Sequence, residues 1–293
     1  MHENPSETQA QSAGRIGGSS TSPTKQAAAR RNGAKGGRPH NYAKQTPPTY
    51  SYPGGKARMA RTLVDLMPQS GRRYAEPFCG RANVFWLAAT ELGYSEWHLN
   101  DLRTASWLEA IRDHGHELRV PQCTRMEYYR RWADDKRGCP YASMLAPYMT
   151  FSGAGYGAGG YRSNKKGGST AKGYEQSIKM AQHILHATDA RITALPWQEV
   201  LADLGPDDTA YIDPPYIDCD VSAYRPDDIS HRDLVDHLLV APYRWLLSEY
   251  DQPIYREAFG EPLLRQKAAT RHGIPRIECV WGSLHPQPDF HTH

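Results

Sequence analysis

A strand, a glycine turn, a helix and a second strand follow one another early in the chain, and this order constrains the fold more than any other feature. The run Arg73–Phe78 predicts a strand, Gly80 lies in the turn, and the following helix would be capped by Asn83. The next strand, Trp97–Leu99, runs into Asp101. An acid about 20 residues after such a glycine turn is placed to bind a ribose hydroxyl. The order is typical of a nucleotide-binding α/β fold.

The rest of the sequence continues the alternation. Strand patterns recur at 209–212, 245–248 and 277–281, and helical periodicity recurs at 174–188 and 230–239. A length of 293 residues suits one large α/β domain with an insertion. We therefore expect a basic disordered tail over residues 1–46, a catalytic domain from 47–118 and 192–293, and an inserted lobe over 119–191.

Composition excludes several classes. No run of the sequence approaches the 18 apolar residues of a membrane span, and the first 30 residues lack the apolar core of a signal peptide. We expect a cytoplasmic protein. The five cysteines are scattered without a Cys-x-x-Cys pair, so we expect neither a structural zinc site nor disulfides.

Charge is distributed unevenly along the chain. Residues 1–46 carry seven basic and two acidic residues, and residues 119–191 carry twelve basic and five acidic residues, whereas the remainder is acidic. In the 119–191 segment the basic residues alternate with Tyr and Trp, and a glycine-rich run follows, which favours phosphate contacts and stacking on a nucleic acid. The candidate DNA-binding residues are Arg130, Arg131, Arg162, Asn164, Lys165 and Lys166.

The sequence Asp213-Pro214-Pro215-Tyr216 directly follows the strand pattern 209–212. Ligands of open α/β sheets bind at the carboxyl ends of strands. There Asp213 and the carbonyl of Pro214 can each accept an N–H of a nucleobase amine, which frees the lone pair of its nitrogen. Pro214 and Pro215 hold these acceptors rigid, and Tyr216 can stack on the base.

An additional ligand-binding segment, Tyr52-Pro-Gly-Gly-Lys56, precedes the first helix. Its two glycines allow a close approach of the backbone, and Lys56 can reach a carboxylate or a backbone carbonyl from the start of the helix.

Together these motifs resemble, in order, those of the Dam-like class of S-adenosylmethionine-dependent N6-adenine DNA methyltransferases. The resemblance covers roughly residues 50–285 and rests on the segments 52–56, 76–85, 100–101 and 213–216, with 161–167 resembling the recognition hairpin of the family. It implies a Rossmann-like methyltransferase fold with an inserted basic, mostly helical DNA-recognition lobe that contains a hairpin.

By the same resemblance the chain would transfer a methyl group from S-adenosylmethionine to a flipped adenine at a specific site in duplex DNA. It would act without a metal, as a monomer, and a partner restriction endonuclease stays open. The catalytic residues would be Asp213, Pro214, Pro215 and Tyr216. The cofactor residues would be Tyr52, Lys56, Phe78, Gly80, Asp101 and Trp197. The sequence departs from the family at Ala82, where a second glycine is usual. The added methyl group at a position of close approach would weaken cofactor binding.

Three other interpretations stay open at this point. The first is a catalytically weakened DNA-binding module of the same fold, which the presence of Ala82 in the glycine turn would support. An amino methyltransferase acting on cytosine N4 or on RNA would use the same Asp-Pro-Pro-Tyr residues. A nicotinamide-dependent oxidoreductase has only the glycine turn and Asp101 in support and leaves the basic lobe unexplained.

Overall fold

The computed structural model describes residues 48–50, 54–153, 155–157, 160–162, 170–217, 229–268 and 276–283. All of them belong to the unit Pro47–His293, which begins where the chain divides after Thr46. The predicted tail, residues 1–46, lies outside the described residues.

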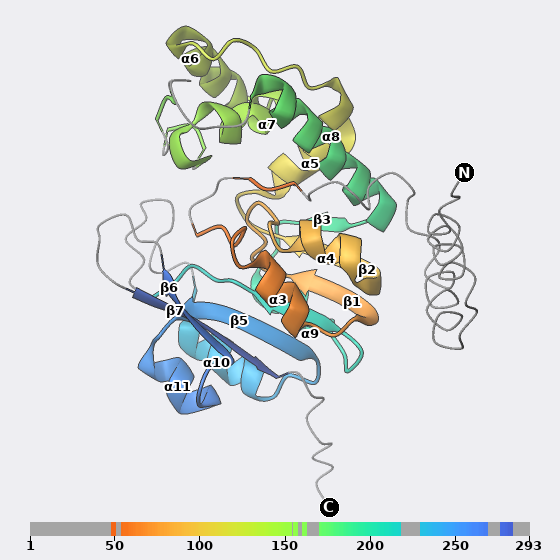
Figure 1. Cartoon of the computed structure of the whole chain (residues 1–293), viewed down its shortest axis with the longest axis vertical. Helices are drawn as coiled ribbons and strands as arrows, with labels where there is room; N and C mark the ends of the chain where they lie inside the picture. Colours follow the sequence, from red (N-terminus) through yellow and green to blue (C-terminus); the bar gives the residue numbers. More distant parts are fainter. Residues whose placement is uncertain are drawn as a thin grey trace, which may run out of the picture. The chain divides into compact units, whose positions relative to one another are not determined.

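A seven-stranded sheet with the order β3-β2-β1-β4-β5-β7-β6 forms the centre of this unit (Figure 1). Its strands are β1 (Ser70–Glu76), β2 (Gly93–Asn100), β3 (Arg191–Thr193), β4 (Thr209–Ile212), β5 (Arg244–Tyr250), β6 (Leu264–Ala268) and β7 (Arg276–Ser283). Neighbouring strands from β3 to β5 pair in parallel, while β7 pairs antiparallel with both β5 and β6. This order and the single reversed strand confirm the Rossmann-like α/β fold.

The sheet changes its direction of growth between β1 and β4. From β1 the chain continues outward to β2 and β3, then returns to add β4 and β5 on the other side of β1. Loops that leave the carboxyl ends of β1 and β4 therefore diverge, and such a position is where open α/β sheets bind ligands. Because β7 runs in reverse, its first residues lie beside the last residues of β5, at this same edge.

Alternating residues of the strands divide the core into two hydrophobic clusters. Tyr74 and Tyr211 face the first cluster, whereas their neighbours Ala75 and Ile212 face the second. The first cluster includes residues of α3 (Ala60–Leu66), α4 (Phe85–Glu91) and α5 (Ala105–His114). The second includes residues of α9 (Trp197–Ala202), α10 (His231–Leu239) and α11 (Pro253–Phe259). Burial on both faces is complete at β4, where all four residues are buried, as expected of a central strand in a parallel sheet.

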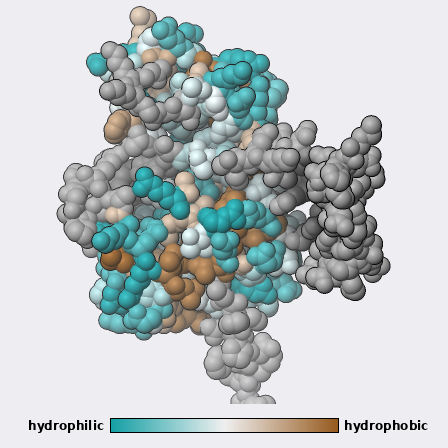
Figure 2. Space-filling view, in the orientation of Figure 1, coloured by the Kyte–Doolittle hydropathy of each residue, from teal (hydrophilic) through white to brown (hydrophobic). Residues whose placement is uncertain are grey.

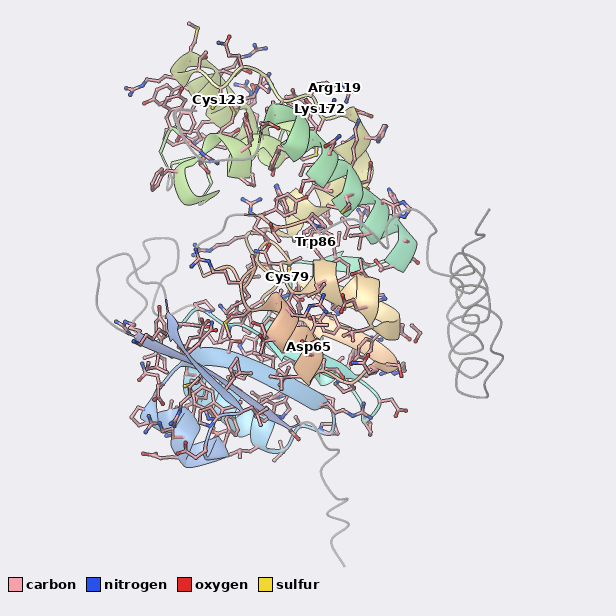
Figure 3. All side chains as sticks on the ribbon, viewed as in Figure 1. Asp65, Cys79, Trp86, Arg119, Cys123 and Lys172 are labelled. Atoms are coloured by element: carbon pink, nitrogen blue, oxygen red, sulfur yellow. The ribbon has the colours of Figure 1, made fainter. Side chains whose placement is uncertain are left out.

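The segment between β2 and β3, which includes the predicted insertion over residues 119–191, is mostly helical, and it begins with α5. It contains η1 (Gly115–Glu117), α6 (Arg125–Asp135), α7 (Pro140–Met149), η2 (Phe151–Gly153) and α8 (Ala171–Thr188). In Figure 3 the labelled side chains of Arg119, Cys123 and Lys172 lie among these helices, whereas Cys79 lies beside the sheet. An isolated antiparallel bridge joins Thr150 to Tyr161.

Capping residues explain several helix starts. The side chains of Thr124, Thr170 and Ser230 each accept the backbone N–H three residues later, at the starts of α6, α8 and α10. The predicted cap at Asn83 is wrong, because α4 begins after Val84 without a side-chain cap. The patterns also missed β6 and α11.

Asn83 instead pairs with the backbone of Tyr50. Its amide oxygen accepts the Tyr50 N–H at 2.9 Å, and its amide nitrogen donates to the Tyr50 carbonyl at 3.0 Å. The Tyr50 ring packs edge-on against Trp107 and Tyr174, and its hydroxyl donates to the carbonyl of Ser177 in α8. The buried Tyr50 thus connects the segment before Lys56 to α5 and α8.

Candidate active site

The glycine turn after β1 is fastened to the end of β2 by Asp101. The Gly80 N–H donates to one oxygen of the Asp101 carboxylate at 3.0 Å, and the N–H groups of Arg103 and Thr104 donate to the other at 2.8 and 2.9 Å. A carboxylate offers about four lone-pair sites. Asp101 therefore keeps room for about one further hydrogen bond, which is what a ribose hydroxyl would need.

Ala82, in the same turn, has a left-handed backbone. Its φ is +54°, close to the +52° of Gly80, and it is one of two residues other than glycine with positive φ among the described residues. Its side chain is fully buried. The backbone has thus kept the conformation that a glycine would adopt without strain, and the alanine bears the cost.

Asn100, just before Asp101, braces the ends of three strands. Its amide nitrogen donates to the carbonyls of Pro77 and Leu195 at 2.9 and 3.0 Å. Its amide oxygen accepts the Leu195 N–H and the hydroxyl of Thr193. All of its polar atoms are used inside the fold, so Asn100 holds the edge in place.

Asp213 lies directly after β4, where the loops from the carboxyl ends of β1 and β4 diverge. Its side chain contacts Lys56. The Lys56 Nζ is 2.8 Å from Asp213 Oδ1 and 2.7 Å from the carbonyl oxygen of Gly54. Burial raises the pKa of Asp213 to about 6, against the opposing effect of Lys56. Despite the burial of Lys56, its pKa is raised because Asp213 and a second carboxylate hold its proton.

That second carboxylate is Glu278 of β7. Its Oε1 is 3.2 Å from Lys56 Nζ and accepts the Tyr216 hydroxyl at 2.7 Å. Lys56 also lies over the Tyr216 ring, 4.7 Å from its centre, and Tyr250 packs edge-on against that ring. Burial is the main reason that the pKa of Tyr216 is raised well above its usual value, so its hydroxyl remains a donor.

A buried acid of β5 supports the chain after Asp213. The two carboxylate oxygens of Glu249 accept the N–H groups of Ile217 and Tyr250 at 3.1 and 2.6 Å. His231, at the start of α10, lies 3.7 Å from this carboxylate and contacts the Tyr255 hydroxyl. Burial raises the pKa of Glu249 to about 9 and lowers that of His231, so the two groups are mainly neutral at pH 7.

The other predicted cofactor residues are placed as follows. Phe78 packs against the cluster that contains Trp197, whose ring is edge-on to His237 of α10. Tyr52 lies outside the described residues. Lys56 is in contact with Asp213 and Glu278, and its role in cofactor binding stays a prediction.

The predicted DNA-binding residues differ in their environment. The Arg130 side chain is 67% exposed, whereas that of Arg131 is 15% exposed, pairs with Glu127 at 2.6 Å and lies over the Tyr141 ring. The Arg131 side chain therefore makes its contacts with residues of the same helical segment, Glu127 and Tyr141. Arg162 is partly buried, and Asn164, Lys165 and Lys166 lie outside the described residues. The surface over α8 that faces the viewer in Figure 2 is mainly hydrophilic.

Three buried acids at this edge escaped the sequence analysis: Glu76, Glu249 and Glu278. Burial raises the pKa of Glu76 to about 8, and the Tyr74 hydroxyl donates to it at 2.7 Å. The available signal was an acid inside an otherwise apolar strand pattern, which is unusual unless the acid is paired or functional.

The described part of the chain contains no group of three His, Cys, Asp or Glu side chains arranged to hold a metal ion. No described helix is long and apolar enough to cross a membrane. Cys79, Cys123, Cys139 and Cys279 are free thiols.

Comparisons with known proteins give a family match and several similar solved structures. Residues 52–233 match the model of the D12 class N6 adenine-specific DNA methyltransferase family. Similar solved structures include the human methyltransferase 10 domain containing protein (10% identity, 78% of this chain and 80% of the other, TM-score 0.32). They also include the N-terminal domain of human METTL16 in complex with SAH (12%, 78% and 68%, TM-score 0.31). Such identities and TM-scores add no weight to the family match. A comparison with curated proteins found no match.

Proposed function

We propose, since the chain belongs to the D12 class N6 adenine-specific DNA methyltransferase family, that it methylates the N6 amine of adenine in duplex DNA. The observation that carries this proposal is the Asp213–Lys56 ion pair at the point where the chain diverges between β1 and β4. It brings together two motifs that lie far apart in the sequence and that both belong to the matched segment.

The chain uses S-adenosylmethionine, the cofactor of its family, which supplies the methyl group. The residues at the edge of the sheet suit such a nucleoside. Asp101 can accept about one more hydrogen bond, Gly80 has no side chain, and Phe78, which is partly buried against the cluster that contains the buried Trp197, offers apolar surface for a base. We assign these four residues to the cofactor.

Asp213 would act on the target amine. The adenine N6 nitrogen is a weak nucleophile because its lone pair is delocalised into the ring. When the carboxylate of Asp213 accepts one N–H and the carbonyl of Pro214 accepts the other, the nitrogen moves toward tetrahedral geometry. Pro215 fixes the backbone at this point, so these acceptors need little reorganisation.

Adenine in duplex DNA is stacked and paired, so it must leave the helix at a cost of a few kcal/mol. We propose that Tyr216 stacks on the extruded base and that the insertion at 119–191 holds the DNA backbone meanwhile. Arg130 and Tyr129 are both exposed on α6, which supports a role of this helix in phosphate contact and stacking.

The test is an assay of duplex DNA incubated with the protein and S-adenosylmethionine, then digested to nucleosides and analysed by mass spectrometry. The proposal expects N6-methyladenine. Methylation found only as N4-methylcytosine, or only on RNA, would replace the proposed substrate while keeping the reaction class. Cofactor binding without methylation of any nucleic acid would support a weakened DNA-binding module.

A further inference from the structure

The site holds two acids and one ammonium group rather than a simple ion pair. Lys56 Nζ lies 2.8 Å from Asp213 and 3.2 Å from Glu278. Both Lys56 and Glu278 are more than nine-tenths buried, so solvent screens their interaction little. With both acids ionised the cluster carries one net negative charge.

This net charge matters for the reaction proposed above, on which the inference rests. When S-adenosylmethionine supplies the methyl group, the amine nitrogen would gain positive charge as its bond to the methyl carbon forms and the carbon–sulfur bond breaks, and it would then release one proton to water. An ion pair made only of Asp213 and Lys56 would have no net charge. The second carboxylate, that of Glu278, gives the cluster one net negative charge beside the reacting nitrogen. Fixed charge aimed at charge that develops in the transition state is an effective form of catalysis.

Glu278 also fixes the aromatic ring of the site. Its Oε1 accepts the Tyr216 hydroxyl at 2.7 Å, while its Oε2 lies 3.4 Å from the Gln266 amide nitrogen on β6. The side chain that holds Tyr216 is thus itself held by the sheet. A stacking ring on a loop needs such support if it is to receive a base in one orientation.

We propose that Glu278 is a positioning residue of the active site, which anchors Tyr216 and shares Lys56 with Asp213 so that the cluster keeps its negative charge. The groups that act on Asp213 from the surrounding elements are Lys56, Glu278, Tyr216, Tyr211, Glu76 and Glu249. Burial has the largest effect and raises the pKa of Asp213, Lys56 lowers it, and Glu278 raises it.

Two variants separate the two roles. In Glu278→Gln the amide oxygen can still accept the Tyr216 hydroxyl, but the negative charge is lost. We expect kcat to fall about tenfold. In Glu278→Ala the anchor is lost as well, and we expect kcat to fall about a hundredfold with a higher KM for DNA, as for loss of a hydrogen bond to a charged group. Glu261→Gln, at an exposed acid before β6, is the matched control and should change neither constant.

The deciding measurement is the titration of Asp213 by NMR of carboxyl-labelled aspartate, with the resonance assigned from Asp213→Asn. The wild-type midpoint should lie at about 6, and Glu278→Gln should move it to lower pH. If Glu278→Gln changed neither the titration midpoint of Asp213 nor kcat, the proposal would be overturned. Glu278 would then have a structural role only, without an effect on the pKa of Asp213. A shifted midpoint in a protein that methylates no DNA would uphold the charge sharing and reject the proposed substrate.

Discussion

Ala82 lies in the glycine turn at the position where the family resemblance led us to expect a second glycine, and its backbone is left-handed. A left-handed backbone at a residue other than glycine costs roughly 1–2 kcal/mol. The fold nevertheless keeps Ala82 at φ +54° with its methyl group fully buried. The turn is therefore held by its neighbours, including the Gly80–Asp101 hydrogen bond, and not by the preference of the alanine itself.

We expect Ala82→Gly to stabilise the protein by up to about 1 kcal/mol, because relief of strain exceeds the added entropy of the unfolded chain. Urea unfolding would measure the gain, and calorimetry would show whether S-adenosylmethionine binds more tightly. Ala89→Gly in α4 is the control, where a glycine at ordinary helical angles should cost about 1 kcal/mol. Destabilisation by Ala82→Gly would contradict the strain.

Elements distant in sequence hold the segment that follows β4. Glu249 of β5 accepts the N–H of Ile217, and His231 of α10 lies beside Glu249. Because Glu249 is buried, its pKa is about 9, against 4.5 for an ordinary glutamate. Between these values the folded protein retains a proton that the unfolded chain releases, so stability falls as pH rises through this range.

Glu249→Gln should remove this contribution, because the amide cannot ionise. The variant should therefore gain stability relative to the wild type between pH 6 and pH 8.5, as measured by urea unfolding at both values. Glu257→Gln, an exposed position on α11, should show no such gain. A difference between variant and wild type that does not change with pH would contradict a protonated Glu249.

Local signals predicted the parts of the site that lie within one strand–turn–helix unit. Gly80 and Asp101 follow from the spacing of one such unit, and their contact is present. Glu278 did not follow, because β7 brings it to Asp213 from 65 positions downstream by reversing its direction in the sheet. The contact of Lys56 with Asp213 likewise depends on the strand order, which local patterns leave undetermined.

Whole-chain charge is uneven in a way that suits a polyanionic partner. Residues 119–191 carry twelve basic and five acidic residues, while the chain outside this segment and residues 1–46 is acidic. The described helices of the basic segment also expose apolar groups, with Met126 82% and Tyr129 54% exposed. This combination is expected of a surface that contacts both phosphates and bases.

We expect the affinity for DNA to fall steeply with salt, with a log–log slope of about −3 to −5 if three to six phosphates are contacted. Arg130→Ala should reduce the slope by about one. Arg232→Ala, an exposed position on α10, should leave it unchanged. Fluorescence anisotropy at several salt concentrations gives all three slopes, and a flat response in the wild type would contradict the electrostatic account.

We propose that the Asp213 carboxylate, set beside Lys56, activates the target amine. Single-turnover methyl transfer by Asp213→Asn, with DNA and S-adenosylmethionine both bound, measures this most directly. We predict a loss of at least about a hundredfold, with binding of DNA and cofactor within about twofold of the wild type. A variant that transfers the methyl group at close to the wild-type rate would contradict the claim.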